Sequence, residues 1–200
     1  MPSQQSSVAP SSSDQPVGAE DASLLDQVAR GEIREVLSVL MEREGAAVHR
    51  FCLQQLRDGA LAEDVVQTVF VQAYRDLPRF TPRSSIRVWL FTIARNRCLD
   101  ELRRARRWRN LLTWPGTLPD LAGAVAEPEG ERHQWQTAFK DCLARLSAQV
   151  RECLLLRFSA NLSYEEIANV TGGKAGALRV RIARAMPVLR RCLQHKEVEP

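Results

Sequence analysis

The chain has 200 residues, of which 44% are hydrophobic, enough to build one or two folded domains. Its 28 Lys+Arg and 24 Asp+Glu residues give a mildly basic net charge of +4. No apolar run approaches the roughly 20 residues that a membrane-spanning helix needs, and no cationic start precedes an apolar stretch. We therefore expect a cytoplasmic protein with no signal peptide and no membrane insertion of its own.

Residues 1–20 form a tail rich in Ser, Pro and Gln, which we predict to be disordered because it has almost no large apolar residue. After the tail, apolar residues recur with helical spacing and no strand alternation appears, which predicts an all-α fold. Between residues 24 and 56 we predict short helices joined by turns at Gly31 and Gly45. A further helix is expected over residues 61–77.

A loop over residues 78–85 precedes a predicted helix over residues 86–107, which Ser84 or Ser85 can cap. The second half of this helix is strongly cationic: Arg95, Arg97, Arg103, Arg104, Arg106 and Arg107, followed by Arg109. A helix C-terminus needs one or two cations to match its dipole, so this number favours a surface that contacts phosphate. Pro, Gly and acidic residues break the periodicity over residues 108–134, which we interpret as a flexible linker.

The last third of the chain has the pattern of a helix-turn-helix. Two amphipathic helices, over residues 135–146 and 150–158, are expected to precede it. Ser163 and Glu166 then fit a capping box, and Gly172-Gly173 end the short helix. The next helix has an apolar side and a cationic side. The apolar side contains Leu178, Ile182, Met186, Leu189 and Leu193, and the cationic side contains Arg179, Arg184, Arg190 and Arg191, with Arg181 at the edge. We expect a kink at Pro187. An apolar back with a cationic front is typical of a DNA-reading helix.

Nothing in the pattern indicates a metal site, a cofactor or an enzyme. The five cysteines are scattered and form no Cys-x-x-Cys pair, so we predict buried, reduced thiols: Cys52, Cys98, Cys142, Cys153 and Cys192. The three histidines are far apart in unlike contexts: His49, His133 and His195. Neither a phosphate-binding loop nor a nucleophile motif is present.

Several short motifs follow one another in a specific order. The first half contains Ala62-Glu63-Asp64-Val65-Val66-Gln67, Phe70, Leu77-Pro78-Arg79-Phe80, Ser84-Ser85-Ile86-Arg87-Val88-Trp89-Leu90 and Ile93-Ala94-Arg95-Asn96. The second half contains Leu154-Leu155-Leu156-Arg157, Leu162-Ser163-Tyr164-Glu165-Glu166-Ile167-Ala168 and Gly176-Ala177-Leu178-Arg179-Val180-Arg181. With this order and spacing, the chain after the tail resembles the bacterial RNA polymerase sigma factors of the extracytoplasmic-function (ECF) type.

The resemblance implies two small helical domains joined by the linker. A domain like sigma region 2 is expected over residues 21–107, and a helix-turn-helix domain like sigma region 4 over residues 135–196. Such a factor binds RNA polymerase core and directs promoter recognition, DNA melting and transcription initiation, here in a stress or signal response. Its implied partners are the polymerase core, promoter DNA and a separate anti-sigma factor.

The resemblance also implies three groups of site residues. Polymerase docking is expected at Asp64, Val66, Gln67 and Phe70. The start-proximal promoter element is expected to meet Arg79, Ser84, Ser85, Arg87, Arg95, Asn96, Arg103 and Arg104. The upstream element is expected to meet Lys174, Arg179, Val180, Arg181 and Arg184. Asn96 suits a bidentate contact to a base edge, and Arg179 and Arg184 suit guanine, whereas Lys174 and Arg181 suit phosphate.

Three positions depart from the family's pattern: Thr68 replaces an acidic residue, Gly173 an apolar one, and Val180 a hydroxyl residue, which favours contact with a thymine methyl. Trp89 is expected in the core rather than as a stacking platform for a base. The alternative function is a dimeric helix-turn-helix regulator that binds operator DNA without polymerase. It would bind a palindrome with half-sites one helical turn apart.

Overall fold

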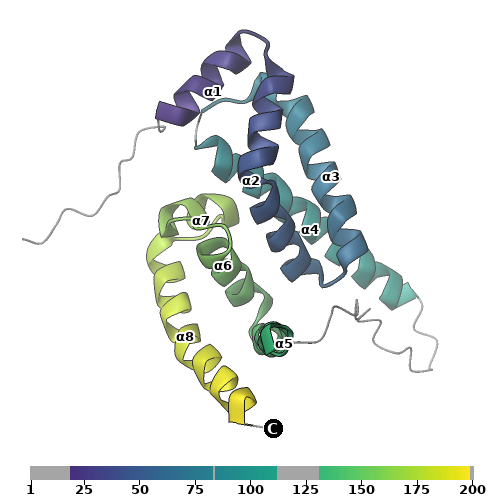
Figure 1. Ribbon diagram of the computed structural model, residues 1–200, viewed down its shortest axis with the longest axis vertical. Helices are drawn as coiled ribbons and strands as arrows, with labels where there is room; N and C mark the ends of the chain where they lie inside the picture. Colours follow the sequence, from purple (N-terminus) through teal and green to yellow (C-terminus); the bar gives the residue numbers. More distant parts are fainter. Residues whose placement is uncertain (1–18, 83, 112–130, 199–200) are drawn as a thin grey trace, which may run out of the picture.

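The computed structural model describes residues 19–82, 84–111 and 131–198, which fold into helices without a strand in these ranges (Figure 1). The predicted all-α class is therefore confirmed. An N-terminal module contains α1 (Ala19–Ala29), α2 (Ile33–Leu56), α3 (Gly59–Asp76), the short 3-10 helix η1 (Leu77–Arg79) and α4 (Ile86–Leu111). A C-terminal module contains α5 (Glu131–Ala144), α6 (Ala148–Phe158), α7 (Tyr164–Thr171) and α8 (Ala175–Val198). Among the described residues, no helix is both long and apolar enough to cross a membrane.

The turn predicted at Gly31 is present, whereas the one predicted at Gly45 is wrong. Gly31 has a φ of 82°, the left-handed conformation that glycine adopts easily, and it separates α1 from α2. Helix α2 instead continues through Gly45. A glycine inside a helix costs about 1 kcal/mol relative to alanine. Burial of Leu40 and Val48, one turn to either side of it, offsets this cost.

The start of α4 is held by two side-chain caps. The Ser85 hydroxyl accepts a hydrogen bond from the Val88 amide at 3.2 Å, so the predicted serine cap is confirmed. A carboxylate oxygen of Asp21, in α1, accepts another from the Ile86 amide at 3.1 Å. This second cap ties α1 to α4 and satisfies an amide that the first turn of a helix leaves free.

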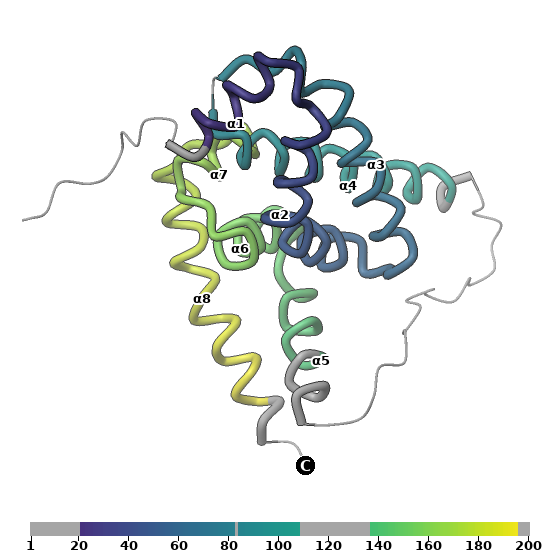
Figure 2. Tube along the Cα trace, turned by 45° about the horizontal axis from the view of Figure 1, so that its top comes forward, coloured from purple at the N-terminus to yellow at the C-terminus, as the bar shows by residue number. Residues whose placement is uncertain are grey.

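The two modules pack against each other. Helix α6 contacts α2, and α7 contacts α4, as Figures 1 and 2 both show. The buried side chains of α2, α3 and α4 are continuous with those of α6, α7 and α8 in one hydrophobic core. Of the predicted linker, residues 112–130 lie outside the described residues, but its two ends are helical because α4 reaches Leu111 and α5 begins at Glu131. Residues 1–18 of the predicted tail also lie outside, while Ala19 and Glu20 belong to α1.

The prediction that all five cysteines are reduced is wrong for two of them. Cys142 of α5 and Cys192 of α8 form a disulfide, with a Cα–Cα distance of 5.8 Å. The pair is separated by 50 residues and meets only because α5 and α8 lie side by side (Figure 2), so spacing along the chain could not reveal it. Cys52, Cys98 and Cys153 are buried free thiols, as predicted.

Replacing both Cys142 and Cys192 with alanine is expected to lower the free energy of unfolding of the C-terminal module by about 2–4 kcal/mol. The reason is that the bridge closes a loop across a separation of 50 residues in the unfolded chain. Urea unfolding without reductant measures the loss, and the wild-type chain in excess dithiothreitol serves as the control that should match the variant. A variant as stable as the oxidised wild type would contradict the prediction.

Candidate nucleic-acid interface

Helices α7 and α8 form the predicted helix-turn-helix. The capping box at the start of α7 is complete: the Glu166 amide donates to the Ser163 hydroxyl at 3.1 Å, and the Ser163 amide donates to the Glu166 carboxylate at 2.7 Å. Gly172, with a φ of 73°, ends the helix in the left-handed conformation. Ile167 of α7 and Leu178 of α8 are buried in the same core, which fixes α8 against α7.

Helix α8 presents arginines to solvent and leucines to the core, as predicted. The apolar positions Leu178 and Ile182 are each 2% exposed. The opposite face carries the exposed cations Arg179, Arg184, Arg190 and Arg191, with Arg181 half-buried between the two faces. Lys174 is exposed directly before the helix, where backbone amides and the helix dipole favour an anion such as phosphate. The helix continues through Pro187 as one element.

A groove of about 680 Å³ runs along the N-terminal half of α8. Its walls include Val150 of α6 and Val180, Arg181 and Arg184 of α8. Val180 is 50% exposed, so an apolar contact to a ligand in this groove is open to it. The groove thus combines cationic and apolar groups beside the exposed arginine row.

The predicted start-proximal residues lie on α4 and the segment before it. Arg79, Asn96, Arg103 and Arg104 are exposed, whereas Ser84, Ser85, Arg87 and Arg95 are half-buried. Arg103 and Arg104 pair with Asp100 and Glu101 one turn earlier, at 3.2 and 3.0 Å. Exposed pairs of this kind contribute only about 0–1 kcal/mol, so phosphate can displace them.

Arg87 and Arg95 each pair with a buried glutamate, Arg95 through hydrogen bonds and Arg87 through charge, because its Nε forms no hydrogen bond. Arg87 Nε lies 3.1 Å from an Oε atom of Glu44 in α2, whose side chain is 8% exposed. Arg95 Nε lies 2.8 Å from Oε1 of Glu152 in α6, whose side chain is 11% exposed. The second pair joins the two modules. The sequence analysis did not identify either glutamate. Each lies among apolar residues at helical spacing, and an acidic residue in such a position is expected to be buried against a cation.

The predicted polymerase-docking residues divide between surface and core. Asp64 and Gln67 are exposed and Val66 is half-buried. Phe70 is 6% exposed and belongs to the hydrophobic core, so it does not lie on the exposed face of α3 with Asp64 and Gln67. Its position, four residues after Val66 and one after the buried Val69, directs it inward.

The exposed face of α3 carries two large side chains that sequence reasoning missed. Val71 and Tyr74 are 51% and 41% exposed. They follow Asp64 and Gln67 at helical spacing and complete one solvent-facing row. A mixed row of one acid, one amide and two large apolar groups has the composition of a protein-binding surface.

Trp89 packs inside the N-terminal module, as expected, rather than standing free in solvent. It is half-buried against both hydrophobic clusters of the fold. Its ring lies 5.1 Å from that of Phe80, in the segment before α4, at an interplanar angle of 53°. The contact fixes the segment that carries Arg79 relative to α4.

Three free thiols lie in the core, at the level where the modules meet. A hydrogen bond with Cys52, reinforced by burial, raises the pKa of Cys98 far above its usual range. Burial also raises the pKa of Cys153, against the opposing effect of a hydrogen bond with Arg181. Both groups therefore remain neutral thiols at physiological pH.

Iodoacetamide is expected to leave these three thiols unlabelled in the native protein at mildly alkaline pH. The reaction requires thiolate, which the raised pKa of Cys98 and Cys153 keeps scarce at those two groups, and burial blocks access to all three. Mass spectrometry after timed labelling tests this, with the chain in guanidinium chloride as the control that should gain three labels. Rapid native labelling at Cys98 would show that this part of the core opens readily.

Comparison with known proteins agrees with this geometry. Residues 40–108 match the family Sigma-70 region 2, and residues 136–186 match Sigma-70 region 4. The sigma factor CarQ of Myxococcus xanthus is 31% identical over 172 residues, covering 85% of this chain and 96% of CarQ. The ECF sigma factor SigC of Mycobacterium tuberculosis is 37% identical over 142 residues, covering 67% of this chain and 71% of SigC.

Two solved structures have similar folds. CnrH, in complex with the cytosolic domain of CnrY, has a TM-score of 0.63 and 27% identity, covering 88% of this chain and 97% of CnrH. The sigma factor RpoE of Bartonella quintana, in complex with the anti-sigma factor NepR, has a TM-score of 0.63 and 26% identity, covering 87% of this chain and 99% of RpoE. Three observations indicate the same family: the order of the two matched regions, the helix-turn-helix with its arginine face, and these relatives. The chain belongs to the RNA polymerase sigma factors of the ECF type.

Proposed function

We propose that this chain binds RNA polymerase core in the cytoplasm and directs it to promoters, while the polymerase alone performs the chemistry. The observation that carries the proposal is the membership of both modules, in order, in the sigma factor family. The exposed row Asp64, Gln67, Val71 and Tyr74 on α3 supplies the docking surface for polymerase. Phe70 supports that row from beneath.

The C-terminal module reads the upstream promoter element. Helix α8, the second helix of the helix-turn-helix, enters the major groove with Arg179 and Arg184 toward guanine edges and Val180 toward a thymine methyl. Lys174 and Arg181 contact phosphate, which provides affinity and register without sequence preference. The exposure of this arginine row on a helix fixed by the core supports the assignment.

The N-terminal module binds the start-proximal element and one strand of the melted DNA. Asn96, exposed on α4, contacts a base edge. Phosphates are contacted by the arginines Arg79, Arg87, Arg95, Arg103 and Arg104. The segment before α4 is lined by Ser84 and Ser85. Glu152 accepts hydrogen bonds from Nε and Nη2 of Arg95, so phosphate that binds this edge of the guanidinium competes with Glu152. DNA binding at this edge therefore weakens a contact between the modules.

A second feature of the contact between the modules favours its opening. Burial, and after it the nearby charge of Arg57, which directly follows α2, lower the pKa of Arg151 in α6. The contact thus includes an attractive pair, Arg95–Glu152, and a repulsion between Arg57 and Arg151. Polymerase and promoter DNA can open it at moderate cost, and an anti-sigma factor can hold it closed. The complexes of CnrH with CnrY and of RpoE with NepR support such a partner.

Run-off transcription with purified polymerase core tests the proposal. Core plus this chain is expected to yield discrete transcripts from genomic fragments that core alone does not yield. An absence of specific transcripts, together with binding of a palindromic duplex by a free dimer, would instead favour an operator-binding regulator. The match to two sigma regions in one chain does not favour that alternative.

A further inference from the structure

We propose that Tyr164 is a positioning residue for base reading: its ring holds the Arg179 guanidinium in a reading orientation before DNA binds. The proposal rests on the role proposed above for Arg179 at the upstream element. It adds a residue of α7, the supporting helix of the helix-turn-helix, to the recognition of sequence by α8.

Tyr164 is a fixed platform. It is the first residue of α7 and lies inside the capping box, between Ser163 and Glu166. Its half-buried ring packs against the hydrophobic core. The Arg157 guanidinium carbon lies 5.3 Å from the ring centroid, and Arg157 Nη1 also donates to the Leu162 carbonyl at 2.8 Å. Cap, core and Arg157 together leave the ring little freedom to move.

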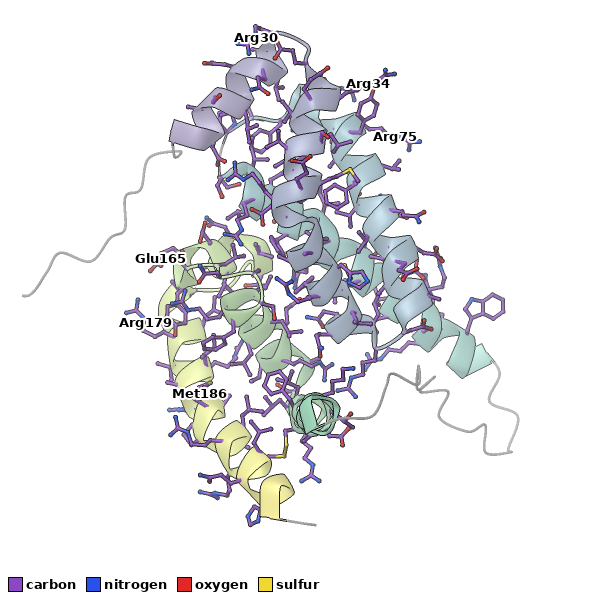
Figure 3. All side chains as sticks on the ribbon, viewed as in Figure 1. Arg30, Arg34, Arg75, Glu165, Arg179 and Met186 are labelled. Carbon is purple, nitrogen blue, oxygen red and sulfur yellow. A yellow bond between two sulfur atoms is a disulfide. The ribbon has the colours of Figure 1, made fainter. Side chains whose placement is uncertain are left out.

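Arg179 rests on this platform although it stands in solvent. Its guanidinium carbon lies 5.1 Å from the Tyr164 centroid, while its side chain is 64% exposed. Glu165 stands beside it, as Figure 3 shows, with a carboxylate oxygen 3.8 Å from Nη2. That distance is too long for a hydrogen bond, and both groups are exposed, so solvent screens their attraction. The ring contact is therefore the main restraint on the arginine.

Stacking of this kind suits a base-reading arginine. An aromatic ring that engages the flat face of a guanidinium leaves the N–H donors along its edge free. Those donors form the fork that matches O6 and N7 of guanine. Ordering a long, exposed side chain before binding removes part of the entropy that binding would otherwise lose.

The experiment measures guanine discrimination by the full chain bound to polymerase core. The probe is a duplex selected from a random library by the wild-type complex, compared with the same duplex carrying 7-deazaguanine, which lacks N7, at one guanine at a time. The ratio of the two affinities is measured for wild type, Tyr164→Leu, Tyr164→Phe, Arg179→Ala and the double variant Tyr164→Leu/Arg179→Ala. Because the readout is a ratio, a smaller folded fraction in one variant cancels.

Arg179→Ala is expected to abolish the ratio at one guanine. Tyr164→Leu is expected to reduce it about two- to fivefold, Tyr164→Phe to leave it unchanged, and the double variant to equal Arg179→Ala. A full ratio in Tyr164→Leu, with the ratio lost in Arg179→Ala, overturns the proposal for Tyr164 and leaves base reading by Arg179 intact. A full ratio in Arg179→Ala overturns both.

Discussion

Replacing Asn96 and Arg179 together with alanine is expected to lower promoter-directed initiation at least about thirtyfold. Each residue is assigned one base contact, worth about 1–3 kcal/mol of discrimination. The residues lie on different modules, so the two losses should add. The expected sum of about 2–6 kcal/mol converts to that factor or more. Single-round transcription from one promoter, with purified core and each variant, measures the effect.

Arg190→Ala is the matched control for this prediction. Arg190 is an exposed arginine on the same helix as Arg179, three turns further along, so its loss removes the same charge. It should weaken binding to all sequences slightly and leave promoter choice unchanged. If the double variant initiates as well as the control, neither residue reads a base.

Replacing Glu152 with glutamine is expected to shift the free protein from the packed arrangement of the two modules toward a separated one, and to tighten DNA binding. The change leaves Arg95 facing a neutral partner, and the loss of such a charged hydrogen bond costs about 1–3 kcal/mol. That cost converts to about a five- to hundredfold lower population of the packed arrangement. Small-angle X-ray scattering should report a larger radius of gyration, and a filter-binding assay should report a lower Kd for promoter DNA.

Glu44→Gln is the control, because Glu44 also pairs with an arginine of α4 but lies in the same module. It should lower the melting temperature without enlarging the folded protein. Exchanging the charges, with Arg95→Glu and Glu152→Arg in one chain, should restore the compact form but remove the DNA contact proposed for Arg95. An unchanged radius of gyration in Glu152→Gln would show that this ion pair does not hold the modules together.

Features that depend on local spacing could be predicted from the sequence. The capping box of Ser163 and Glu166 and the Gly172 stop follow from the chemistry of a few adjacent residues. The division of α8 into an apolar and an arginine face follows from a period of 3.6 residues. Burial and dihedral angles confirm each of these features.

Features that depend on distant segments could not be predicted in this way. The disulfide Cys142–Cys192, the Asp21 cap on α4 and the Arg95–Glu152 pair each join residues at least 50 positions apart. Gly45 was misjudged because tertiary burial outweighed its local preference. The burial of Phe70 could not be predicted from the motif alone, because that motif contains core residues as well as exposed ones.

Footprinting of polymerase core with this chain on one promoter tests the central claim most directly. The account predicts an upstream protected segment, lost in Arg179→Ala, and a separate melted segment that reacts with permanganate, lost in Asn96→Ala. It also predicts neither segment with core alone. A single protected palindrome that appears without polymerase, and persists in both variants, would contradict it.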